Sequence, residues 1–257
     1  MNKDFYISIF GDRYDREAVL FPASVTILLI VFALGNILHG YLEHIDVQDS
    51  KVHMTIFAIL ILIITKIMMW IIRTLSKNSI ERLTYGKEKL NFPTISMLLP
   101  SSSILSNEYK NRILLKAQKD FEIDLNTSIS NQEDETKVRK VIAEVTNLIR
   151  KKVSRLERTE TYLIKNIRYG RCRNMIGGST IAILIQLVIT IYSAIKGYSL
   201  FCPIISITIS CMLDLYMFYI YKQAGIEYAK ELFENYLICK NNEKYKNYFL
   251  SSIKWRY

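Results

Sequence analysis

The sequence predicts an all-α membrane protein in which two transmembrane helical hairpins flank a helical cytoplasmic insert. The first observation is a set of four apolar stretches, at residues 21–41, 54–72, 175–195 and 200–221. Each is close to the roughly 20 residues that a helix needs to cross a bilayer. The second observation is the spacing, because about a hundred mostly polar residues separate the two pairs of stretches. The third is the charge, which is gathered on one side of the predicted membrane.

On this interpretation the chain has five segments. They are a cytoplasmic N-terminal segment (1–20), transmembrane hairpin 1 (21–72), a basic helical cytoplasmic domain (73–174), transmembrane hairpin 2 (175–221) and a cytoplasmic C-terminal helix and tail (222–257). Hydrophobic residues make up 50% of the chain and charged residues 23%. Their separation into blocks is typical of membrane proteins rather than of a soluble domain. The first apolar stretch lacks a small-residue cleavage site, so we expect no cleavable signal peptide.

The distribution of basic residues predicts the orientation. Of the 34 lysines and arginines, Lys51 and Lys196 lie in the loops predicted outside, Lys66 lies within a span, and the remaining 31 fall on the other side. Because basic residues are retained in the cytoplasm, both termini and the central insert are expected there. The short Lys196-Gly197-Tyr198-Ser199 link makes the last two spans a tight hairpin. Gly177-Gly178-Ser179 is predicted to let the third span approach another helix closely, either within one subunit or at an oligomer contact.

The first part of the insert is predicted to be helical with interruptions. Residues 73–90 read as a continuation of the second span, and Phe92-Pro93-Thr94 ends that helix. A short helix is expected to start near Ser106, with Glu108 in its first turn. Its candidate apolar contacts are Tyr109, Ile113 and Phe121.

The second part of the insert is predicted to be one long helix that runs almost unbroken into the third span, with Gly170 as a bend. Ser130 and Glu133 have the spacing of a capping box at its start. Apolar residues recur at helical steps and form one stripe: Val138, Ile142, Val145, Ile149, Val153, Leu156, Leu163 and Ile167. Such a stripe needs a partner, either other helices of the chain or the same helix of a neighbouring subunit.

The other faces of this helix are strongly basic, with twelve Lys or Arg against three Glu between residues 137 and 174. One interpretation is a solvated face whose last arginines, up to Arg173, fix topology at the lipid headgroups. The other is a site for a polyanion such as a nucleotide or oligonucleotide, with Tyr162 and Tyr169 stacking on bases. The candidate ligand-binding residues are Arg150, Lys151, Lys152, Arg155, Arg158, Lys165, Arg168 and Arg171.

Two ionisable residues fall inside predicted spans, Lys66 in the second and Asp214 in the fourth. Counted from Arg73 and Lys222, both lie about 11 Å inside the cytoplasmic boundary, at 1.5 Å per helical residue. A charge at this depth needs a partner or water. We expect the two to pair, within or between subunits, or to line a wet cavity. In the competing interpretation Lys66 extends alone to the headgroups and Asp214 is protonated.

Several signatures of chemistry are missing from the sequence. It has no nucleotide-binding glycine loop, no nucleophile elbow and no histidine pair with metal-ligand spacing. The cysteines, which form no C-x-x-C pair, are expected to be buried apolar residues rather than zinc ligands or disulfides: Cys172, Cys202, Cys211 and Cys239. We therefore expect no enzyme, no cofactor and no metal site.

Several short motifs resemble a family of small bacterial four-span membrane proteins. They are Tyr14-Asp15-Arg16 followed by Leu20-Phe21-Pro22-Ala23, Phe92-Pro93-Thr94 leading to Tyr109-Lys110-Asn111-Arg112, Asn166-Ile167-Arg168-Tyr169-Gly170-Arg171-Cys172-Arg173-Asn174, and Gly225-Ile226-Glu227-Tyr228-Ala229. The third is the most specific, an Asn-x-x-Tyr-Gly-aromatic-Arg-Arg-Asn run before the third span. This chain departs from it, because Arg171 replaces the aromatic residue and Cys172 replaces the first arginine.

The build is similar to the Hailong-type membrane effector of bacterial anti-phage defence and abortive infection. That resemblance implies an oligomeric ion channel held shut by a short single-stranded DNA that a partner nucleotidyltransferase makes. The expected protein is thus a ligand-gated effector of the bacterial inner membrane and a homo-oligomer, with a tetramer as one candidate assembly. The alternative is a non-channel anchor or scaffold that recruits a soluble partner through the insert.

Overall fold

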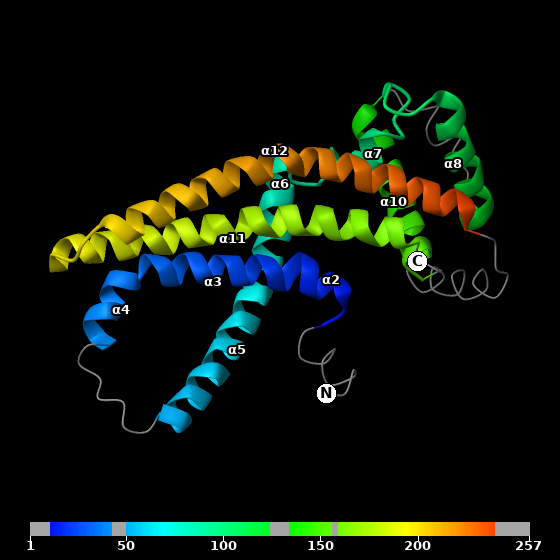
Figure 1. The fold of residues 1–257 in the computed structure, drawn as a ribbon. Coiled ribbons are helices and arrows are strands. Elements are labelled where there is room, and N and C mark those ends of the chain that lie inside the picture. Colours follow the sequence, from blue (N-terminus) through cyan, green and yellow to red (C-terminus); the bar gives the residue numbers. More distant parts are fainter. Residues whose placement is uncertain (1–10, 43–49, 124–133, 156–158, 240–257) are drawn as a thin grey trace. The chain divides into compact units, whose positions relative to one another are not determined.

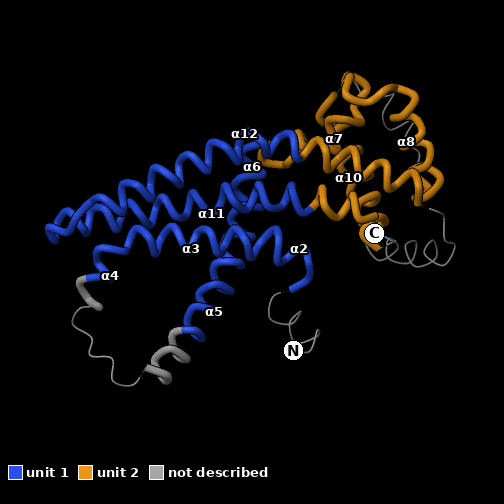
Figure 2. Tube along the Cα trace, in the orientation of Figure 1, with its two compact units in different colours: residues 1–84, 167–224 blue, residues 85–166, 225–257 orange. Residues whose placement is uncertain are grey.

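The computed structural model describes residues 11–42, 50–123, 134–155 and 159–239, which are mostly helical, with no strand among them. They form two compact units, coloured separately in Figure 2. Unit 1 comprises residues 1–84 and 167–224, and unit 2 comprises residues 85–166 and 225–257. Two helices, α11 (Glu160–Lys196) and α12 (Phe201–Ile238), contribute residues to both units.

Four helical segments of the described chain are long and apolar enough to cross a membrane. They are Arg13–Ala33, Ala58–Tyr85, Glu160–Lys196 and Phe201–Ile238. The protein is therefore all-α over the described residues, and its composition is that of a membrane protein. Each apolar stretch predicted from the sequence overlaps one of these segments.

Unit 1 is built from the first helices of the chain together with the central parts of α11 and α12. The elements are α2 (Arg13–Asp15), η1 (Arg16–Leu20), α3 (Phe21–Ala33), α4 (Gly35–Leu42), α5 (Ser50–Leu75), η2 (Ser76–Ile80) and α6 (Glu81–Tyr85), where η1 and η2 are π-helical turns. Within this unit α3, α11 and α12 lie side by side, whereas α5 diverges from α3 toward its own N-terminal end (Figure 1).

The first span differs from the prediction in its boundaries. Helical structure begins at Arg13 rather than at residue 21, because the Asp12 carboxylate accepts a hydrogen bond from the Asp15 amide (2.9 Å) and caps the first turn. At the other end, Leu34 separates α3 from α4. The cytoplasmic segment predicted over residues 1–20 is thus partly helical and continuous with the apolar stretch.

Two adjacent glycines of α11 allow the close approach that the sequence predicts. A Cβ added at Gly177 would overlap the Ser76 side chain and come within 3.4 Å of the Ser76 Cα, and one added at Gly178 would overlap the Thr26 hydroxyl. Gly170 is also covered, by the Tyr14 ring. These small residues therefore pack α11 against α3 and η2 within one chain.

Unit 2 contains α7 (Pro93–Ser96), α8 (Asn107–Phe121) and α10 (Glu135–Arg155), with the first turns of α11 and the last turns of α12. The predicted start of α8 is confirmed, because the Ser106 hydroxyl accepts from the Tyr109 amide (3.3 Å). The predicted apolar stripe is confirmed over α10, where its members are all buried: Val138, Ile142, Val145, Ile149 and Val153. Of its last three members, Ile167 is buried on α11, Leu163 is intermediate, and Leu156 lies outside the described residues. The predicted capping box at Ser130 and Glu133 lies outside the described residues.

The prediction of one unbroken helix from the stripe into the third span is wrong. α10 ends at Arg155 and α11 begins at Glu160. The Thr159 hydroxyl accepts from the Tyr162 amide (3.2 Å) and so caps α11. Asn235 of α12 in turn binds Thr159, since its amide nitrogen donates to the Thr159 hydroxyl over 2.7 Å. This side-chain contact from a distant part of the sequence favours a helix start at that position.

Candidate functional site

A buried layer of charged and aromatic side chains crosses unit 1 where α6, α11 and α12 meet. Arg173 Nη1 donates to Glu81 Oε1 over 2.6 Å, and the two side chains are only 9% and 8% exposed. The Tyr169 hydroxyl donates to the same carboxylate oxygen (3.3 Å) and lies 2.8 Å from the Tyr221 hydroxyl. We call Glu81, Tyr169, Arg173 and Tyr221 the polar layer. Arg173 is therefore a buried partner of Glu81 and not the headgroup contact of the topology interpretation.

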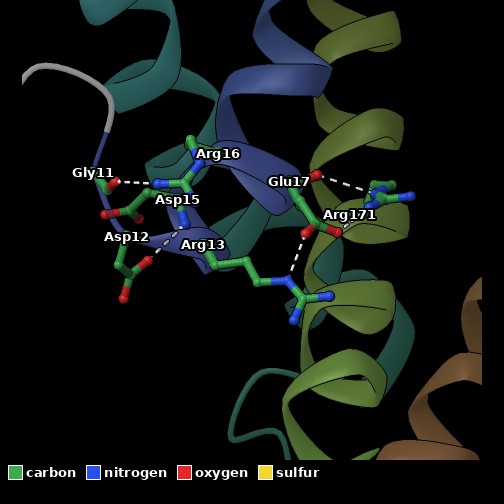
Figure 3. A network of polar contacts seen from close by, with 7 residues as sticks. All are labelled: Gly11, Asp12, Arg13, Asp15, Arg16, Glu17 and Arg171. Carbon is green, nitrogen blue, oxygen red and sulfur yellow. Dashed lines mark hydrogen bonds and ion pairs between the residues drawn. The ribbon is translucent and has the colours of Figure 1, made fainter. Parts of the chain in front are cut away.

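A second ion-pair network lies on the α2–η1 side of unit 1 (Figure 3). Arg171 Nη2 donates to Glu17 Oε2 (2.9 Å), and its Nε donates to the Glu17 carbonyl (3.0 Å). Glu17 also accepts from Arg13 Nε over 2.8 Å. The Arg171 guanidinium lies 5.7 Å from the centre of the Phe21 ring. Arg171, a predicted ligand-binding residue, is thus engaged in holding α11 to the N-terminal helices.

Asp214 is held by hydroxyl groups in the apolar part of unit 1. Its Oδ2 accepts from the Thr180 hydroxyl (3.2 Å), and its Oδ1 accepts a short hydrogen bond from the Ser179 hydroxyl. Lys66, on α5, is exposed. Within the described chain no ion pair joins Lys66 to Asp214, so the intrachain form of the predicted pair is absent there.

Further along α11 and α12, hydroxyl and amide groups are buried between the helices. Gln186 Nε2 donates to Ser206 Oγ (2.8 Å), and Gln186 Oε1 accepts from Ser210 Oγ (3.2 Å). The Ser206 hydroxyl in turn donates a hydrogen bond to the Leu29 carbonyl (2.7 Å). All three side chains of α11 and α12 are fully buried. These hydrogen bonds join α3, α11 and α12 within one chain.

Comparison of the chain with protein-family models, with curated proteins and with solved structures finds no match. The function is therefore argued from the arrangement of these side chains and of those in unit 2.

Arg150 occupies an aromatic niche in unit 2. Its guanidinium lies 5.3 Å from the Phe92 ring centre and 6.0 Å from that of Tyr228, and Nη2 donates to the Thr94 hydroxyl (3.4 Å). Its Nε is buried and has no hydrogen-bond partner. A buried N–H group without an acceptor is costly, so this niche has an unused donor.

Lys152 belongs to a network that joins α8, α10 and α12. Its Nζ lies 2.6 Å from Asp120 Oδ2, and the Asp120 side chain is only 2% exposed. The same oxygen accepts from the Tyr236 hydroxyl (2.7 Å). Next to it, Lys116 Nζ donates to three carbonyl oxygens at the end of α12, those of Tyr236 (2.8 Å), Leu237 (3.0 Å) and Cys239 (2.7 Å). Burial lowers the pKa of Lys116, while the Asp120 charge opposes that shift.

The two tyrosines predicted to stack on bases are buried. Tyr162 is 3% exposed and packs on Tyr228, with ring centres 5.9 Å apart, and Tyr169 is 5% exposed in the polar layer. Neither ring is available to a base in this arrangement. Lys165, one of the predicted ligand-binding residues, pairs with Glu227 (2.7 Å).

The predicted ligand-binding residues therefore fall into separate groups. Arg150, Lys152, Lys165 and Arg171 are engaged in contacts within the chain, as described above. Lys151 and Arg155 are exposed on α10, and Arg168 is exposed on α11. Arg158 lies outside the described residues. Residues up to Lys165 belong to unit 2, whereas Arg168 and Arg171 belong to unit 1.

The cysteine prediction is correct for one residue and wrong for another. Cys172 is buried, whereas Cys211 is exposed on α12, and Cys202 and Cys239 are intermediate. All four are free thiols. Sequence reasoning also missed Lys116 and Lys110, because their partners are backbone carbonyls that no sequence pattern identifies. Lys110 Nζ is buried and donates to the Leu99 carbonyl (3.0 Å).

Proposed function

We propose that this protein is an oligomeric, ligand-gated effector of the bacterial inner membrane that conducts ions. The observation that carries the proposal is the pair of ionisable residues within the apolar helices, Lys66 and Asp214. An ionisable group at membrane depth is costly and is kept where it faces a bundle interior, an ion path or a partner charge. A plain anchor gains nothing from either group, so their presence favours a conducting effector over a scaffold.

The proposed orientation places both termini and residues 73–174 in the cytoplasm, as the distribution of basic residues implies. Unit 2 is then the part that meets a soluble ligand. The helices α11 and α12 supply residues to both units without a break in either helix. A ligand that binds unit 2 more tightly in one arrangement of these helices would shift the population of that arrangement in the membrane.

The proposed ligand is a polyanion, either a nucleotide or a single-stranded DNA oligomer from a partner nucleotidyltransferase, and the proposed role in anti-phage defence rests on the family resemblance. Lys151 and Arg155 support a polyanion because they are exposed, basic and one turn apart on α10. Arg150 is next to them in sequence, but its guanidinium is held by Phe92, Tyr228 and Thr94. We propose Lys151 and Arg155 as the first contacts.

The conducting role is tested with purified protein in liposomes. An ion flux that appears or disappears with an oligonucleotide supports the proposal. No flux under any ligand condition, with the protein folded and inserted, would overturn it and favour the anchor.

The ligand site is tested separately by oligonucleotide binding. We expect Lys151→Glu with Arg155→Glu to abolish or strongly weaken binding and to reduce the salt slope by about 1.4, at roughly 0.7 per lost phosphate contact. The matched control is Lys119→Glu with Lys137→Glu, two exposed lysines of α8 and α10 whose replacement changes the net charge equally. Equal weakening by both pairs would mean nonspecific attraction and would contradict a site at Lys151 and Arg155.

A further inference from the structure

The apolar part of α5 is exposed around most of its circumference. Only 17% of its membrane-length window is buried, against 44% for α11. Lys66 shares one face of this helix with Leu62, Ile63 and Trp70, which are 46%, 50% and 69% exposed. A helix that is apolar on all sides is stable only in lipid or against another apolar surface. Lys66 is thus a positive charge at the centre of an unpartnered apolar face.

Asp214 lies at a second surface of the same unit, beside the junction of α11 and α12. Its carboxylate is half-buried and is fixed by Ser179 and Thr180, of which Thr180 is exposed. Cys211 and Phe218, one turn to either side on α12, are also exposed. Each carboxylate oxygen has two lone pairs and here accepts one hydrogen bond from the chain, so each can accept another.

Each charge lies well inside the apolar part of its own helix. Lys66 precedes Arg73, which pairs with Asp15 (3.0 Å), by seven residues, or about 11 Å of helix. Ser179 and Thr180, which hold Asp214, follow Arg171 by eight and nine residues, or about 12 to 14 Å of helix. At such positions in an apolar helix, an opposite charge is a favoured partner.

We propose that a second copy of this chain covers these surfaces, with Lys66 of α5 in one copy paired to Asp214 of α12 in its neighbour. The charges are opposite, each lies inside the apolar part of its own helix, and no ion pair joins them within the described chain. In hydrocarbon such a pair is much stronger than in water and is specific, because any shift along the helix axis leaves two unpaired charges. The proposal deepens the proposed function, since it names the contact that would assemble the oligomer.

Cross-linking between two tagged copies tests the contact. In a background in which the four native cysteines are replaced by serine or alanine, one copy carries Lys66→Cys and the other Asp214→Cys. Both are co-expressed and treated in membranes with a short bifunctional maleimide, because an ion pair holds its Cβ atoms farther apart than a disulfide allows. The proposed pair predicts a cross-linked product that carries both tags. A cross-link within a single chain cannot produce it, because each chain carries only one tag.

The matched control replaces Lys66→Cys by Ile64→Cys, which is exposed at nearly the same depth but on another face of α5. We expect a several-fold lower yield of the doubly tagged product from this control. Equal yields from both positions would mean random collision and would overturn the proposal, as would the absence of a product from an assembled oligomer.

Exchanging the two charges gives a second measurement. It uses the chain with its four native cysteines and so does not depend on their replacement. Lys66→Asp and Asp214→Lys are each expected to dissociate the oligomer in detergent, and the two changes in one chain are expected to restore it. An unchanged oligomer in Lys66→Met would mean that Lys66 extends alone to the headgroups, and this would overturn the pair. Cross-linking without ion flux would support the intersubunit pair and reject the channel. Ion flux without cross-linking would support the channel and reject the pair.

Discussion

Unit 1 and unit 2 use their basic side chains in different ways. In unit 1 the arginines pair with carboxylates between helices, as Arg173 does with Glu81 and Arg171 with Glu17. Unit 2 also has such pairs, at Lys152 and Lys165, but two further lysines donate to backbone carbonyls. Lys110 donates to the Leu99 carbonyl, and Lys116 donates to three carbonyls at the end of α12. The comparison shows that some basic side chains, which in the sequence look like contacts for a ligand, instead hold the helices of the fold together.

The buried pair of unit 1 gives the largest expected effect. Arg173→Met removes the guanidinium that neutralises the buried Glu81 carboxylate and should reduce the free energy of unfolding by about 3 to 5 kcal/mol, measured by denaturant unfolding in detergent. Adding Glu81→Gln should recover part of that loss because it removes the charge.

Its control is Arg171→Met, two residues away. This arginine and Glu17 are 39% and 38% exposed, so the loss should stay below about 1 kcal/mol. An equal loss of unfolding free energy in Arg171→Met and Arg173→Met would show that burial does not determine how much each ion pair stabilises the protein.

Lys116 tests the carbonyl contacts of unit 2. Lys116→Met removes three hydrogen bonds from an ammonium group and should cost about 2 kcal/mol, less than their sum because water can reach some carbonyls at a helix end. Faster amide exchange over residues 232–239 is the measurement. The exposed Lys119→Met on the same helix should leave that exchange unchanged, and an equal acceleration there would contradict the role of Lys116.

The smallest effect is expected at the helix contact of unit 1. Gly177→Ala forces a methyl group against Ser76 and should destabilise unit 1 by about 1 to 2 kcal/mol, seen as a lower Tm. Gly35→Ala is the control, since its nearest neighbour is Cys202 Sγ at 3.9 Å and a methyl group fits there. A drop in Tm with Gly35→Ala as large as that with Gly177→Ala would reject the packing argument.

The sequence predicted what depends on local pattern and missed what depends on distant partners. Hydropathy located the four apolar segments, and periodicity located the buried stripe of α10. The break before α11 was missed because Thr159 is held by Asn235, 76 residues away. The burial of Arg173 was missed because its partner Glu81 is 92 residues distant. The eight basic candidates looked equivalent in sequence, and only their three-dimensional partners distinguish them.

The most direct test of the proposed gating is the current across a planar bilayer, with the oligonucleotide added from the side on which we propose that unit 2 lies. Gating through α10 predicts that the oligonucleotide changes the current of the unaltered protein and has no effect when added from the opposite side. It also predicts that the Lys151→Glu and Arg155→Glu double variant still conducts but no longer responds. A variant that responds like the unaltered protein, or a current that ignores the oligonucleotide on both sides, would contradict gating by a polyanion bound at α10.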